Sequence, residues 1–404
     1  MAQRHPTDHM TEPASGERAA RSSGEAAAKP APSTSGEIAH VSGAAIVYRL
    51  SDVGYGIRLD QALDLLATSA PERVRPVRGE GQAIQIPNPP ITVVLGTEIM
   101  AVQEWRLEVE VSARIFDFGV ISLRVRIPTP GELSWREFTD FGTAVDDPAV
   151  VHELFEQHLR LLMSRIAPAI DRPEVAPVTE DYIVYRVNRL IGTAGETLST
   201  DALRDVDVVP LLLNEQRPLS ADARRELLPH RFSYYADDLA LLTWNNALVV
   251  EPALHDTDVQ FILEFANAQL LELRYYDALL DAELPLMYDR IANTRSQRVA
   301  FLGRGYAPML GQLQTFVADS TELVERVENS LKVTDDVYLA RVYSATLEIF
   351  RGPAWRAGID RKLRIIRETY AMLQGEAQAG RAEALELSIV LLIVAEIVMA
   401  LIRG

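Results

Sequence analysis

Hydrophobic and polar residues alternate with a period of two in the first half of the chain, and the clearest case lies near residue 105. A first run has apolar residues at every second position, Leu107, Val109, Val111 and Ala113, with charged or small polar residues between them. The run from Ile121 to Ile127 alternates in the same way. This period is typical of half-buried strands, and the intervening Asp117-Phe118-Gly119 suits a tight turn because Gly tolerates positive φ. The pattern predicts a β-hairpin over residues 105–128.

A short segment is repeated later in the chain. Ile46–Leu50 reads IVYRL and Ile183–Val187 reads IVYRV. Each copy precedes helix-like segments, a hairpin pattern (105–128 or 233–252) and then a helix, and such self-similarity favours duplicated structural units. We therefore predict an α+β fold containing two tandem β-α-β-β-α-like units, at about 38–172 and 178–255, within a domain of residues 38–255.

The apolar spacing becomes helical from residue 256 onward. Val259, Ile262, Leu263, Ala266 and Leu270 recur on one helix face. Further helices are predicted over 306–331, 335–350 and 354–373. Gly352-Pro353 and Gly375 are expected to interrupt or end the last two of them. Residues 256–380 are thus expected to form an all-α helical domain. Residues 1–37, rich in Ala, Ser, Gly, Pro and Glu, are expected to form a disordered tail.

The most apolar segment is Leu387–Ile402, whose 16 residues include two polar positions, Ser388 and Glu396. As a helix it spans roughly 24 Å, against about 30 Å for the hydrocarbon core of a bilayer. Its eleven Leu, Ile and Val residues favour insertion by roughly 3–6 kcal/mol, and a central acid opposes it by about 2.5–3.5 kcal/mol. Two interpretations of the C-terminal helix at 385–402 lead, with fraying or disorder of the segment as a third. It spans a membrane with Glu396 at a helix contact, or it is buried in a water-soluble bundle where Glu396 meets an arginine.

Composition narrows the function classes. The formal net charge of −17 disfavours general nucleic-acid binding, and the absence of Cys excludes disulfides, thiolate metal sites and cysteine nucleophiles. One stretch is basic, and it comprises Arg351, Arg356, Arg361, Lys362, Arg364 and Arg367. Three interpretations of this basic patch remain open: contact with anionic lipid, contact with RNA, or a solvated helix face.

Standard catalytic motifs are absent from the sequence. It has neither a phosphate-binding Gly-x-x-x-x-Gly-Lys-Ser/Thr loop nor a Gly-x-Gly-x-x-Gly motif. His152 and His158 are six residues apart, whereas two histidine ligands on one helix need a spacing of four. We therefore predict no catalytic residues, no metal site and no cofactor.

One polar stripe accompanies the predicted helix that begins near residue 256. Its members are Gln260, Glu264, Asn267, Arg274 and Asp277. The first four follow steps of +4, +3 and +7, which place them along one side of a helix. Carboxylate, amide and guanidinium groups in line suit either a polar ligand or partner, or a satisfied network between packed helices.

Several of these segments together resemble a known family. Phe261–Asp277, Glu328-Asn329, Tyr338–Tyr343, Trp355 with Lys362-Leu363, and the apolar end containing Glu396 are similar to the "required for meiotic nuclear division" protein family, over about residues 230–404. The resemblance implies a C-terminal membrane anchor, a non-enzymatic role and self-association. Eukaryotic relatives are linked to the mitochondrial inner membrane and organellar translation, or to sporulation. No mitochondrial presequence is evident at the start of this chain, and its Ala- and Arg-rich composition looks bacterial.

The sequence hypothesis is a non-enzymatic, membrane-anchored homo-oligomeric scaffold. It has a single C-terminal span, a cytoplasmic bulk and helix–helix contacts of coiled-coil type. One alternative is a soluble ligand-binding protein or enzyme that uses the polar stripe. A further alternative is an RNA- or ribosome-associated factor at the membrane.

Overall fold

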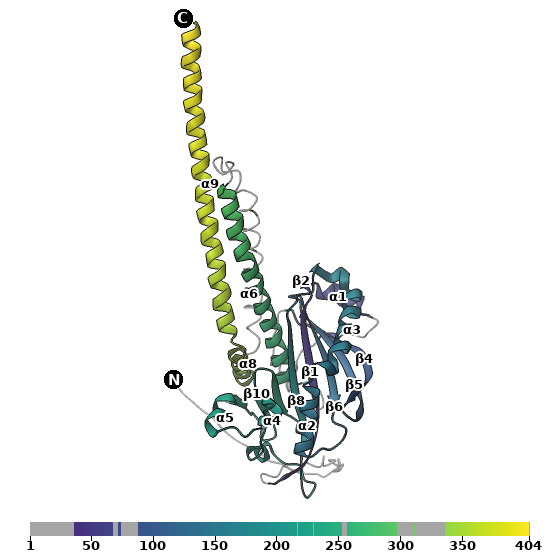
Figure 1. Ribbon diagram of the computed structural model, residues 1–404. Coiled ribbons are helices and arrows are strands. Elements are labelled where there is room, and N and C mark those ends of the chain that lie inside the picture. Colours follow the sequence, from purple (N-terminus) through teal and green to yellow (C-terminus); the bar gives the residue numbers. More distant parts are fainter. Residues whose placement is uncertain are drawn as a thin grey trace, which may run out of the picture.

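The computed structural model describes residues 36–67, 72–73, 88–215, 217–228, 230–252, 257–296, 311, 318 and 336–403. Nearly all of the predicted N-terminal tail and of the predicted helix at 306–331 lies outside these residues. The fold is α+β, with a large sheet in the N-terminal half and a helical C-terminal region that ends in an apolar helix (Figure 1). This confirms the predicted fold class.

Within the described residues, the main sheet has nine strands in the order β3-β4-β5-β6-β1-β8-β11-β10-β9. The strands are β1 (Ile38–Asp52), β3 (Glu72–Arg73), β4 (Ile91–Val102), β5 (Trp105–Ile115), β6 (Val120–Pro128), β8 (Thr179–Gly192), β9 (Arg231–Phe232), β10 (Leu239–Leu242) and β11 (Asn246–Val250). All neighbouring pairs are antiparallel except β8 and β11, which run parallel. Two short strands, β2 (Gly54–Ile57) and β7 (Ile170–Pro173), pair separately. The predicted hairpins are present as β5–β6 and β10–β11.

The two copies of the repeated segment are neighbours at the centre of this sheet. They lie in β1 and β8, which pair antiparallel with Ile46 opposite Val184 and Val47 opposite Ile183. Residues directly opposite one another share a face, so the first residues of the two copies, Ile46 and Ile183, project from opposite faces. Both predicted units therefore contribute to one continuous sheet.

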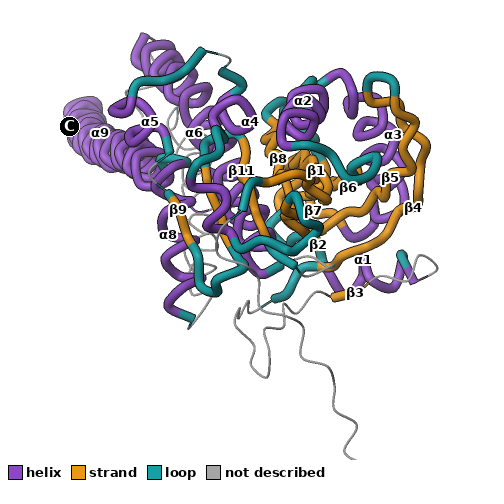
Figure 2. The backbone as a smooth tube through the Cα atoms, turned by 90° about the horizontal axis from the view of Figure 1, so that it is seen from below, coloured by secondary structure: helices purple, strands orange, loops and turns teal. Residues whose placement is uncertain are grey.

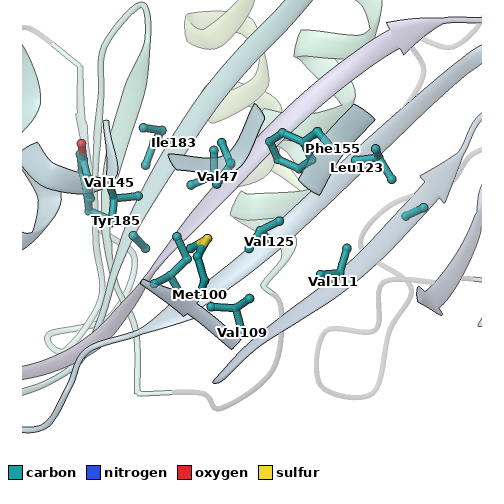
Figure 3. Packing of buried hydrophobic residues seen from close by; sticks show 14 of the residues in the cluster. Val47, Met100, Val109, Val111, Leu123, Val125, Val145, Phe155, Ile183 and Tyr185 are labelled. Atoms are coloured by element: carbon teal, nitrogen blue, oxygen red, sulfur yellow. The ribbon is translucent and has the colours of Figure 1, made fainter. Parts of the chain in front are cut away.

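One face of the sheet is covered by short and medium helices (Figure 2). These are α1 (Leu59–Leu65), α2 (Trp135–Val145), α3 (Ala149–Ile166) and α4 (Val209–Leu213). A capping box in which Ser134 and Glu137 bond each other's backbone begins α2. Figure 3 shows side chains of the strands, including Val47, Val111 and Val125, gathered with Phe155 of α3 in the core of this face. A further helix, α5 (Ala221–Leu227), has no buried residue.

The other face of the sheet is covered by α6 (Asp258–Ser296) and α8 (Val337–Ile349). All residues from Val259 to Leu273 are buried, because this half of α6 lies between the sheet and α8. Tyr48 of β1, Phe116 at the end of β5 and Phe265 of α6 belong to this second core. The start of the predicted helical domain thus forms a layer on the sheet.

Beyond the sheet, α6 continues beside α9 (Gly352–Arg403), and the two helices run in the same direction (Figure 1). A third core joins them through Leu280 and Met287 of α6 and Leu363 and Ile366 of α9. The predicted interruption at Gly375 was wrong, because α9 is a single helix of 52 residues. One interior Gly costs a helix only about 1 kcal/mol, which packing upstream and good helix formers nearby outweigh.

Candidate functional site

Glu264, at the centre of the predicted stripe, is buried against the sheet. It forms an ion pair with Arg114 of β5, and the two side chains are 1% and 4% exposed. The Arg114 Nε also donates to the Thr92 Oγ1 at 3.2 Å, and its guanidinium carbon lies 4.7 Å from the centre of the Phe261 ring. A buried charge is tolerated only where a partner and hydrogen bonds compensate it, and here both are present.

Gln260 and Asn267, also buried, serve the helix itself. The Gln260 Oε1 accepts a hydrogen bond from the backbone N–H of Thr257 at 3.0 Å, and the Thr257 Oγ1 accepts one from the N–H of Gln260 at 3.3 Å. This reciprocal pair is a capping box that begins α6. The Asn267 Nδ2 donates to the carbonyl of Leu263 at 2.9 Å. One polar atom of each amide therefore forms a hydrogen bond with the backbone of α6 or of its first residues.

Arg274 and Asp277 tie α6 to other elements. Arg274 pairs with Glu180 at the start of β8; burial raises the pKa of Glu180, and Arg274 opposes that rise. Asp277 accepts from the Lys362 Nζ of α9 at 2.7 Å, and Asp281 lies 2.6 Å from the same nitrogen. The stripe therefore connects α6 to the sheet and to α9. No stripe residue lines either of the two hollows at residues 230–348 and 47–245. Although the buried Gln260 Nε2 has no hydrogen-bond partner among the described residues, the ion pairs of Glu264, Arg274 and Asp277 favour a network between packed elements over a ligand site.

The basic patch divides in the structure. Lys362 is held by the two α6 carboxylates, and the Arg351 guanidinium carbon lies 5.8 Å from the centre of the Trp244 ring. Arg361, Arg364 and Arg367 are exposed on α9. Because α9 is continuous, Arg367 lies 18 residues, or about 27 Å, before Leu385. That distance exceeds the Debye length of about 8 Å at physiological salt, so the charge of Arg367 is largely screened from charges at the level of Leu385.

The apolar end of α9 lies in the open. Leu385–Ile402 has a mean hydropathy of 2.6 and none of it is buried. Within the described part of the chain it is the one helix that is long and apolar enough to cross a membrane. Glu396 is exposed with the apolar residues around it.

Sequence reasoning missed Arg114, although a signal was present. Arg114 and Ser112 in β5 and Ser122 in β6 occupy the face opposite to the predicted apolar positions, and all three are buried. Both faces of these strands are therefore covered. Small polar residues among the outward positions were the available sign that a second layer packs there.

Sequence comparison places the sheet in a family. Residues 42–257 match the family described as "Uncharacterized protein MJ0711, N-terminal domain", which is more than half of the 404 residues. The chain belongs to this family. The match runs from within β1 to Thr257, the residue before α6, so the MJ0711 N-terminal domain comprises the sheet and the helices on its first face.

A relative of this MJ0711 family comes from Methanocaldococcus jannaschii and is named "Uncharacterized protein MJ0711". It is 24% identical over 197 residues, which is 48% of this chain and 58% of the relative. No solved structure matches the chain. The resemblance of residues 230–404 to the "required for meiotic nuclear division" family concerns mainly the region beyond the MJ0711 match, and it remains a prediction.

Proposed function

We propose that this protein is a non-enzymatic scaffold anchored in a membrane by the C-terminal end of α9. The observation that carries this proposal is the full exposure of Leu385–Ile402 at the end of a helix whose first half is packed against α6. Outside a membrane, water would contact eighteen successive residues of mean hydropathy 2.6. Exposing their CH₂ groups to water has an unfavourable free energy. A bilayer removes this cost.

The dimensions support a single span. Eighteen helical residues cover roughly 27 Å, near the hydrocarbon thickness of about 30 Å. Among the α9 side chains whose burial the structure describes, Leu373 is the last buried one, and about 18 Å of helix lies between it and Leu385. In this arrangement the family domain is held away from the bilayer surface. A partner can therefore reach the sides of the domain.

Self-association is the second part of the proposal. At 100° per residue, Ser388, Ala395, Glu396 and Ala400 occupy one half of the helix, interspersed with Ile389, Leu392 and Met399. The other half holds Leu391, Val394 and Leu401. Small residues permit close helix approach, and an acid within a span usually faces another helix. We assign this face to contact between copies of the chain.

Membrane fractionation tests the anchor. We expect the full chain to resist carbonate extraction and a chain ending at Ala384 to be extracted. Leu391→Arg with Val394→Arg should also release the protein, because each arginine costs about 2.5–3.5 kcal/mol at mid-span. The matched control, Leu391→Ile with Val394→Leu, keeps the hydropathy and should stay in the membrane. A full chain recovered in the soluble fraction would refute the anchor.

The role of Glu396 has a separate readout. Glu396→Leu should remain anchored, and we expect the mass of the detergent-solubilised oligomer to fall. Glu386→Leu, at the edge of the span, serves as the control and should leave the mass unchanged. If Glu396→Leu also left the mass unchanged, the contact role would be lost while the anchor stood.

A further inference from the structure

A partly enclosed cavity of about 190 Å³ lies on the first face of the sheet, where α2 ends and α3 begins. The central strands β1 and β8 form its floor, and the turn between β10 and β11 reaches it through Asn245. Its apolar walls include Val47, Val145 and Val151. The polar stripe and the proposed anchor play no part in this hollow.

One pair of charges in the cavity is already neutralised. The Arg49 Nε and Nη2 donate to the two carboxylate oxygens of Asp181 at 2.8 and 2.7 Å. The Arg49 Nη1 lies 3.0 Å from the His152 Nδ1, and the guanidinium carbon lies 5.3 Å from the centre of the Phe155 ring. Such a bidentate ion pair fixes both side chains and leaves little charge to interact with a ligand.

Asp146, at the end of α2, is different. Its carboxyl is half-buried in the cavity wall and makes no hydrogen bond or ion pair with any residue that the structure describes. Burial raises the pKa of this carboxyl. Burial also raises the pKa of the nearby Tyr185, with a smaller contribution from the Asp146 charge. A carboxylate that loses water without gaining a donor destabilises its site, so the cavity has one uncompensated negative charge.

We propose that this cavity binds a small organic cation, with an ammonium or guanidinium group on Asp146 and a short aliphatic stem between the valines. The charge-assisted bond would replace the lost hydration of the carboxylate. The volume equals that of about six water molecules and is below the roughly 300–1,000 Å³ of most ligand pockets, which excludes nucleotides. A calcium ion would require six to eight oxygen ligands, and an anion would be repelled by Asp146.

Calorimetric titration of the full chain in detergent tests this site. The probes are n-butylammonium and methylguanidinium chloride, with n-butanol as the neutral analogue and KCl to match ionic strength. We expect saturable 1:1 binding of the cations and none of the alcohol. Asp146→Asn should weaken cation binding at least tenfold.

The matched control is Asp147→Asn, in the same turn. The Asp147 Oδ1 accepts from the backbone N–H of Ala149 at 3.0 Å, and an Asn oxygen can do the same, so affinity should not change. Val151→Met fills the cavity without altering charge, and it should weaken binding of both cations. Absence of cation binding, equal binding by Asp146→Asn or Val151→Met, or equal binding of n-butanol would overturn the proposal.

Discussion

At the scale of single residues, buried carboxyls in the part of the chain that the structure describes differ in how they are compensated. Glu264 has Arg114 and Glu180 has Arg274. Asp52, at the end of β1, is 4% exposed and accepts one backbone hydrogen bond from Gly54 at 3.1 Å. Burial, with a smaller contribution from the nearby Glu174, raises its pKa to about 7. Such a group makes stability depend on pH.

Asp52 should make the protein less stable as pH rises through neutrality. Its folded pKa of about 7 is above its unfolded value, so its stabilising contribution is full below about pH 4 and is lost as pH approaches 7. Between pH 5 and pH 8 the free energy of unfolding should fall by roughly 2–3 kcal/mol. Thermal unfolding of the chain ending at Ala384 measures this, and Asp52→Asn should flatten the profile.

The control for this pH profile is Asp64→Asn on the exposed side of α1, which should leave the profile unchanged. The groups that couple to Asp52 are Glu174, Tyr275 and Tyr276. An Asp52→Asn profile as steep as that of the native chain would contradict the assignment.

At the scale of elements, α6 organises the molecule. Its first half covers the second face of the sheet, and its second half packs on α9. The MJ0711 family match ends at Thr257, so the domain and the helix that covers it are adjacent in the chain. The Arg114–Glu264 pair joins the first half of α6 to β5.

Removing one member of that pair should be costly. We expect Glu264→Ala to lower the free energy of unfolding by about 3–5 kcal/mol, because it leaves Arg114 buried without its counter-charge. Replacing both residues by Leu should cost much less, so a double-mutant cycle will show strong coupling. The comparison pair, Asp222 and Arg225, is 89% and 79% exposed, and Asp222→Ala should change stability by less than about 1 kcal/mol. Additive single effects at Arg114 and Glu264 would contradict the coupling.

The same elements show what the sequence could reveal. The β5–β6 hairpin was predictable because its alternation and its turn are local, and Gly119 has a φ of +99° at that turn. Strand β4 was not predicted. A register shift between Val94 and Gly96 breaks its alternation, and its outer residues mix apolar with polar types.

The local pattern of residues could not predict which distant segments of the chain contact one another. The spacing of Gln260, Glu264 and Asn267 correctly placed them on one helix, yet Glu264 meets Arg114, 150 residues earlier in the chain. Likewise, nothing local in Ile46–Leu50 specifies that its neighbour is the second copy at Ile183. Contacts between residues that the topology brings together can be identified only once the fold is known.

At the scale of the whole molecule, the sheet domain and the apolar helix end are at opposite ends of a long arm (Figure 1). From Arg351 to Leu385 is 34 residues, roughly 50 Å of helix. The exposed arginines of the basic patch lie along this arm. With α9 upright in a bilayer, screening at physiological salt separates them electrostatically from lipid headgroups.

The final prediction concerns the arginines themselves, because a chain ending at Ala384 has no span to hold them at this distance. The acidic balance of the protein, −17 for the full chain, opposes its approach to an anionic surface. A chain ending at Ala384 should not bind vesicles rich in phosphatidylserine at physiological salt, and Arg361→Gln, Arg364→Gln and Arg367→Gln together should change nothing. If the patch did contact lipid, each arginine would contribute about 1 kcal/mol, and the triple variant would lose more than a hundredfold in vesicle affinity. Co-sedimentation with anionic and neutral vesicles distinguishes the two outcomes. Arginine-dependent binding would mean that the patch contacts lipid when it can reach the surface, which would favour an anchored chain with α9 lying along the bilayer over one whose sheet domain is held at a distance.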